Sequence, residues 1–223
     1  MNRTTLFNRL AVGLLAAAPL ISAVADDDMR TYAVSITNLT RGVSFTPIMV
    51  ATHQEGFRLY NLGAPPSDAL ADMAESGSTA SLAAVVNATP MGRTASSSGL
   101  LEAGKTVTVT VVSPKGSSHM SVAAMMLPTN DGFIAVTNVP LPKEKQVLTY
   151  LSNGHDAGSE PNDELCSNIP GPTCRGQGGS PGVGGEGFVH IHAGIHGIGN
   201  LEASEYDWRN PVARITVRQV TSE

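Results

Sequence analysis

Residues 120–137 read MSVAAMMLPTNDGFIAVT, two apolar segments separated by a short acidic turn. Asn130-Asp131-Gly132 is typical of a hairpin turn, because these residues tolerate the backbone conformations that tight turns need. The stretch therefore predicts two strands, residues 120–127 and 133–137, that run antiparallel to each other.

Further strand candidates lie on both sides of this hairpin. Residues 31–39 and 106–111 alternate β-branched or aromatic residues with small or polar ones, the period-two pattern of a half-buried strand. Helices do not alternate with the strands, so the pattern favours an all-β antiparallel sandwich over a parallel α/β fold. The remaining candidates are residues 45–51, 147–151, 188–192 and 212–220.

Two short helices are expected between the first strands and the hairpin. Ser67 can cap a helix that leads into Leu70 and Met73, and residues 78–87 carry apolar side chains at helical spacing. We expect one short helical hairpin inserted into the sandwich.

The N-terminal segment has the features of a secretory signal. Arg3 and Arg9 precede an uncharged run, residues 10–25, which ends in Ala23-Val24-Ala25. Its 16 residues fall short of the roughly 20 that span a bilayer. We expect residues 1–25 to be a signal peptide and residues 26–223 a single domain without a transmembrane anchor, exported to a periplasm or secreted.

The charge balance excludes one class of partner. The whole chain has 14 basic and 19 acidic residues. Loss of Arg3 and Arg9 with the signal peptide leaves 12 basic against 19 acidic residues, so the exported form is acidic. A nucleic-acid binder would carry a basic surface, and we expect no such partner.

Cys166 and Cys174 are the two cysteines of the chain. An oxidising compartment favours a disulfide between them, and their spacing matches neither a zinc ribbon nor a redox motif. The bridge would close a nine-residue loop and stabilise the fold by roughly 2–3 kcal/mol.

An acidic loop, residues 153–164, reads NGHDAGSEPNDE. Asp156 and Glu160 lie four residues apart around Gly158, so they converge if the chain turns there. Ca²⁺ prefers six to eight oxygen ligands on a flexible loop, and sandwich loops gather at one end, where Asp131 could share the ion. The alternative is an ordinary solvated acidic loop.

Several fragments together resemble the spondin N-terminal domain family in its bacterial form. They are AAMMLPTND at residues 123–131, DAGSE at 156–160, NPVARI at 210–215, ITNLT at 36–40 and FTP at 45–47. The resemblance implies a C2-like antiparallel β-sandwich with a Ca²⁺ site at one tip. Animal members of this family serve extracellular-matrix adhesion.

The resemblance also implies which residues bind the ion. The family's acids fall on Asp131, Asp156 and Glu160, the last being Glu where the family has Asp; Asn130 and Asp163 are expected as nearby oxygen donors. These assignments imply a secreted, non-enzymatic domain for adhesion or ligand binding. The partner would be an extracellular protein or polysaccharide.

A histidine cluster, residues 188–196 with the sequence FVHIHAGIH, supports a different hypothesis. On a strand, His190 and His192 share one face, and His196 could fold back as a third ligand for Zn²⁺ or Cu²⁺. Such a site keeps a position open for water, as in an exported metalloenzyme. Alternatively, the histidines form hydrogen bonds with backbone groups around Trp208 and the Gly-rich loop, residues 176–185.

Overall fold

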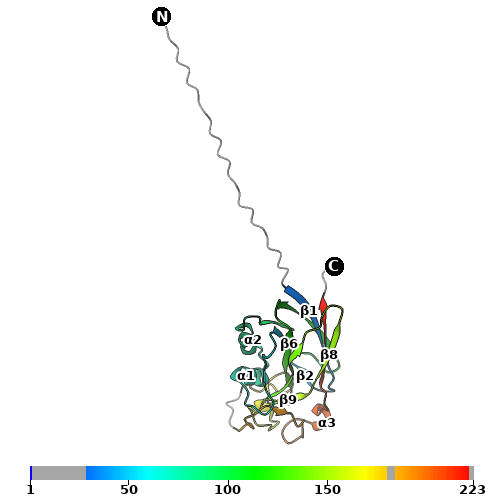
Figure 1. Ribbon diagram of the computed structural model, residues 1–223. Coiled ribbons are helices and arrows are strands. Elements are labelled where there is room, and N and C mark those ends of the chain that lie inside the picture. Colours follow the sequence, from blue (N-terminus) through cyan, green and yellow to red (C-terminus); the bar gives the residue numbers. More distant parts are fainter. Residues whose placement is uncertain (2–28, 180–183, 221–223) are drawn as a thin grey trace.

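The protein forms two antiparallel sheets that pack face to face, with two helices on the outer face of the larger sheet (Figure 1). The computed structural model describes Met1 and residues 29–179 and 184–220. Apart from Met1, the expected signal peptide lies outside the described residues. The structure confirms the all-β sandwich with an inserted helical hairpin.

The first sheet confirms the period-two interpretation. Val109 and Val111 are buried against the second sheet, whereas the hydroxyls of Thr106 and Thr108 face outward. Thr108 hydrogen-bonds Ser35 on the neighbouring strand, with 2.7 Å between the hydroxyl oxygens. Its strands, in order, are β5 (Thr106–Pro114), β1 (Met29–Asn38), β11 (Ala213–Val220) and β8 (Val147–Ser152).

The second sheet is built on the hairpin predicted from residues 120–137. Ala123 pairs with Ala135 and Met125 with Phe133 across the hairpin. Its strands, in order, are β10 (His190–Ile191), β9 (Gly154–Asp156), β7 (Gly132–Pro140), β6 (His119–Leu127), β3 (Met49–His53) and β4 (Arg93–Ser96), and β2 (Ser44–Phe45) also pairs with β6.

Strand β6 is buried on both faces, which explains why its sequence does not alternate. Val122 and Ala124 face the core between the sheets. Ala123 and Met125 face a second core, where Met73 and other side chains of the helices pack against them. A strand covered on both sides is apolar at nearly every position, and the buried exception in β6 is Ser121, whose hydroxyl bonds His53.

The helical hairpin forms as expected from α1 (Asp68–Ser76) and α2 (Ala80–Asn87). The Ser67 side chain accepts a hydrogen bond of 3.3 Å from the Leu70 amide and caps α1. Gly77 ends α1 in the left-handed region, at a φ of 75°.

Three segments differ from the sequence predictions. Residues 45–51 form parts of two strands, β2 and β3, rather than one. Strand β4 arises where no strand was predicted, and β9 lies within the acidic loop, residues 153–164, with a 3₁₀ helix (Cys166–Asn168) just after it. These elements depend on partners distant in sequence, so local patterns do not show them.

The long connections after β9 gather at one end of the sandwich. Figure 1 shows β9 and α3 (Ala203–Tyr206) at this end, opposite the start of β1. The predicted disulfide between Cys166 and Cys174 is present in these connections. Within the described part of the chain, no helix is long and apolar enough to cross a membrane.

Candidate metal centre

Strand β9 brings the two acidic segments and the histidine segment together. Its last residue, Asp156, pairs with Gly132 at the start of β7 and with His190 of β10. Because Asp131 immediately precedes Gly132, the hairpin turn lies beside β9. The backbone register thus places Asp131, Asp156 and His190 at the neighbouring ends of three adjacent strands, with Asp131 just before β7.

Asp131 is completely buried, and its two carboxylate oxygens are used differently. Oδ2 accepts hydrogen bonds from the Ser159 amide at 2.7 Å, the Glu160 amide at 3.0 Å and the Ser159 hydroxyl at 3.2 Å. Oδ1 has no hydrogen-bond partner. One oxygen therefore anchors the loop after β9, while the other remains available to a ligand.

Asp156 is also completely buried and fixes its own loop. Its Oδ1 accepts a 2.7 Å hydrogen bond from the Gly158 amide, and its Oδ2 accepts one of 2.6 Å from the Asn162 side chain. Gly158 has a φ of 69°, and a Cβ there would lie 2.4 Å from the Phe188 carbonyl oxygen. Only glycine allows this turn to pack against the chain entering β10.

The surroundings of Asp131 oppose its charge. Burial, followed by the nearby Asp156 carboxylate, raises the pKa of Asp131 to about 7, although the hydrogen bonds from Ser159 and Glu160 oppose the change. Glu160 is completely buried as well. A buried carboxylate is costly unless it is hydrogen-bonded, paired with a positive charge or bound to a metal.

Asn130 and Asp163, which were expected as nearby oxygen donors, bond to each other. The Asn130 amide nitrogen donates to Asp163 Oδ1 at 2.9 Å. Asp163 Oδ1 also accepts from the Leu165 amide and its Oδ2 from the Asn168 side chain, while Asn130 Oδ1 accepts from the Glu164 amide. These contacts hold the loop against the turn and leave the two residues in a supporting position.

His190 directs its ring toward two carboxylates. Its Nδ1 donates to the Ile191 carbonyl at 2.9 Å, so the neutral ring has its lone pair on Nε2. That Nε2 lies 3.5 Å from Asp156 Oδ1 and 3.7 Å from Glu186 Oε2. Burial lowers the pKa of His190, but the bond to Ile191 and the charges of Asp156 and Glu186 outweigh it, and the net pKa is raised.

His192 has the opposite arrangement. Its Nδ1 accepts a hydrogen bond of 3.0 Å from the Gly194 amide, so the neutral ring has its proton on Nε2, 3.9 Å from Asp156 Oδ2. The ring also packs against Trp208, with 5.0 Å between ring centroids. Burial lowers the pKa of His192. A metal at Nε2 would need that nitrogen unprotonated and Nδ1 protonated, which the Gly194 amide opposes.

His196 is exposed, and its backbone rather than its ring is fixed. Its amide donates at 2.6 Å to Glu164, whose carboxylate also accepts from the amides of Gly197 and Ile198. The sequence analysis missed this role of Glu164, which is buried and organises the turn after the histidines.

One group of three potential metal ligands comes within 4.8 Å among the residues that the structure describes: Asp156, Glu186 and His190. Sequence reasoning missed Glu186, although its position four residues before His190 was a usable signal. The other candidates, Asp131, Glu160, His192 and His196, are not part of this group.

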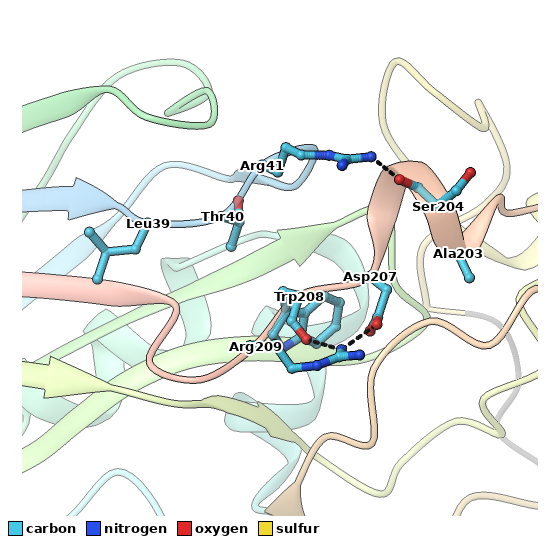
Figure 2. Close-up of a pocket in the computed structure, with 8 residues that line it drawn as sticks. All are labelled: Leu39, Thr40, Arg41, Ala203, Ser204, Asp207, Trp208 and Arg209. Carbon is cyan, nitrogen blue, oxygen red and sulfur yellow. Dashed lines mark hydrogen bonds and ion pairs between the residues drawn. The ribbon is translucent and has the colours of Figure 1, made fainter.

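Two open clefts lie around Trp208, and His192 and His196 line only one of them. Figure 2 shows the larger, of about 460 Å³, in which Arg41 donates to the Ser204 carbonyl and Arg209 to Asp207. The second, of about 350 Å³, shares Trp208 and Arg209 with the first and extends to His192.

A protein-family model matches this chain. The family model described as Spondin_N matches residues 30–159, which is more than half of the chain and includes Asp131 and Asp156. No curated protein matches this sequence.

Proposed function

The chain belongs to the spondin N-terminal domain family, and from this premise we propose that it is a non-enzymatic, Ca²⁺-binding domain for extracellular adhesion or ligand binding. Asp131, Asp156 and Glu160 would hold the ion at the loop end of the sandwich. The ion supplies positive charge and oxygen coordination and takes part in no reaction.

The observation that carries the proposal is the unpartnered Oδ1 of Asp131. A completely buried carboxylate oxygen without a hydrogen bond is rare in a folded protein and indicates a missing ion or water. The raised pKa of Asp131 has the same meaning, because burial and Asp156 oppose its charge. A divalent cation would remove both penalties.

The type of donor favours Ca²⁺ over a softer metal. Asp131 and Asp156 offer carboxylate oxygens, and the loop around them offers carbonyls and access to water, as a six- to eight-coordinate ion requires. The Glu160 amide donates a hydrogen bond to Asp131, which keeps Glu160 close to that carboxylate. Its side chain is one carbon longer than the family's Asp and can still supply oxygen.

Calcium would act first on the loops. Extracellular sites of this type have a Kd of about 10⁻⁴ to 10⁻³ M, equivalent to roughly 4–5.5 kcal/mol. The acidic loop is linked to one of the clefts through Glu164, which accepts a hydrogen bond from the amide of His196 in the lining of that cleft. A protein or polysaccharide partner would then meet an ordered surface.

Asp131→Asn tests the calcium site. The Asn side-chain oxygen can still accept from the Ser159 and Glu160 amides, while the amide nitrogen replaces the oxygen offered to the ion. Wild type should gain about 1.4 kcal/mol, or roughly 3–6 °C in Tm, with Ca²⁺ at ten times Kd. The variant should lose this gain and be at least as stable as wild type in chelator, because a buried charge is removed.

The control is Glu102→Gln, which removes an exposed carboxylate distant in sequence from the proposed ligands. This variant should keep the full calcium-dependent gain in Tm. Thermal melts in chelator and in Ca²⁺ give both measurements. A folded Asp131→Asn protein that retains the wild-type calcium gain would rule out the proposed site.

A further inference from the structure

We propose a second metal site, for Zn²⁺, formed by Asp156 Oδ1, Glu186 and His190 Nε2. It differs from the calcium site in its ligands and shares only Asp156 with it. It also differs from a three-histidine site, because two carboxylates replace His192 and His196.

The distances between the His190 ring and the two carboxylates fit ligands of one tetrahedral ion better than they fit direct hydrogen bonds. His190 Nε2 lies 3.5 Å from Asp156 Oδ1 and 3.7 Å from Glu186 Oε2. Both separations exceed the usual hydrogen-bond range of about 2.7–3.2 Å. Two ligands bound at about 2.0–2.1 Å and at the tetrahedral angle lie roughly 3.3–3.4 Å apart, so the side chains need to move little.

His190 has the hydrogen bonding of a metal-binding histidine. Its Nδ1 donates to the Ile191 carbonyl, which orients the ring and leaves the Nε2 lone pair pointing at the carboxylates. Nε2 is buried and has no hydrogen-bond partner. Metal-bound histidines generally use their other nitrogen in this way.

The two carboxylates share a neighbour in Asn162. The Asn162 side-chain nitrogen donates to Asp156 Oδ2 at 2.6 Å and makes a longer, weaker contact of 3.4 Å with Glu186 Oε1. Asp156 and His190 also face each other in the β9–β10 register. The three ligands are therefore positioned before any ion arrives, by backbone pairing on one side and Asn162 on the other.

The site has a closed side and an open side. The Asp156 side chain is completely buried, whereas 26% of the His190 side chain and 38% of the Glu186 side chain are exposed. A fourth position toward solvent is available to water or to a ligand atom of a partner. One imidazole with two carboxylates suits Zn²⁺, whereas Ca²⁺ takes more oxygens and avoids nitrogen.

Zn²⁺ titration of the mature chain against a chromophoric chelator tests the proposal. Wild type should bind about one equivalent, and His190→Ala and Glu186→Gln should each weaken binding by on the order of 100-fold. His196→Ala is the matched control, because it removes an exposed histidine of the same segment and should bind Zn²⁺ as wild type does.

Thermal melts of the same variants in chelator and in Ca²⁺ distinguish the zinc site from the calcium site. His190→Ala and Glu186→Gln should keep the calcium gain, which also shows that they are folded, and Asp131→Asn should keep Zn²⁺ binding. Wild type without Zn²⁺ binding, or a His190→Ala variant with wild-type affinity, overturns the zinc site whatever the calcium result. Equal losses in His190→Ala and His196→Ala overturn it too.

Discussion

Asp131 has a structural role through one carboxylate oxygen, and the proposed binding role falls to the other. Three donors from Ser159 and Glu160 converge on Oδ2, which alone would account for a conventional buried carboxylate. Oδ1 receives none. This unequal use, rather than the acidity of the loop, distinguishes the proposed calcium site from a solvated acidic turn.

His53, the last residue of β3, is a buried histidine that belongs to neither proposed site. Its Nδ1 donates to the Gln54 carbonyl, and its Nε2 bonds the Ser121 hydroxyl at 2.8 Å. Burial lowers the pKa of His53 below its usual value of 6.5. The neutral ring is therefore part of the folded structure.

The pH dependence of the free energy of unfolding should reveal that folded His53 stays neutral. Below pH about 6.5 the unfolded chain takes up a proton that folded His53 resists, so the free energy of unfolding falls as the pH falls toward the lower, folded pKa. The slope is less than the ~1.4 kcal/mol per pH unit of one fully linked proton. Urea unfolding between pH 7.5 and 5.5 should show a shallower slope for His53→Gln and a wild-type slope for His196→Gln. Equal slopes in all three proteins would contradict this role.

At the scale of elements, the loop after β9 can pack against the segment entering β10 because residue 158 is glycine. Its carbonyl accepts a 2.8 Å hydrogen bond from the Gly187 amide, and a Cβ would collide with the Phe188 backbone. The two segments carry Asp156 and His190, so their close approach determines the geometry of both proposed sites.

Gly158→Ala should therefore destabilise the fold by roughly 2–4 kcal/mol and weaken metal binding. Gly116→Ala is the matched control, since Gly116 also has a positive φ, of 95°, but nothing lies within 4 Å of its Cβ position. It should cost only about 1 kcal/mol of backbone strain. Urea unfolding checks both variants, and equal losses would show that the collision with Phe188 does not matter.

At the scale of the whole molecule, three features act on the long connection after β9: the disulfide, the proposed calcium site and Glu164. The disulfide closes residues 166–174, whereas the proposed calcium ligands all precede Cys166. The third feature is Glu164, which binds three successive amides from His196 onward. The sandwich can thus carry a connection with little regular structure at one end.

Cys166→Ser/Cys174→Ser should lower the free energy of unfolding by about 2–3 kcal/mol, because the bridge restricts the unfolded chain. Denaturant unfolding measures this loss. The calcium gain in Tm should be the same as in wild type, since no proposed ligand lies inside the bridged loop. A parallel loss of the calcium gain would show instead that the bridge positions the ion site.

Much of the sandwich was predictable because burial leaves a local signature. Val109 and Val111 face the core and alternate with threonines that face water, and this period of two is visible in the sequence. The hairpin turn at Asn130-Asp131-Gly132 and the Ser67 cap are equally local. They depend on the backbone preferences and side-chain hydrogen bonds of residues only a few positions apart.

The sequence by itself therefore determined the antiparallel sandwich, the helical hairpin and the disulfide, while the three acids that the family resemblance implies as calcium ligands stay a prediction. Only the tertiary structure decided that β9 lies between β7 and β10. That pairing brings Asp156 beside His190 and Glu186, which are 34 and 30 residues away in the chain. Backbone hydrogen bonds between distant strands make this arrangement, and because every residue can form them, they leave no pattern in the sequence.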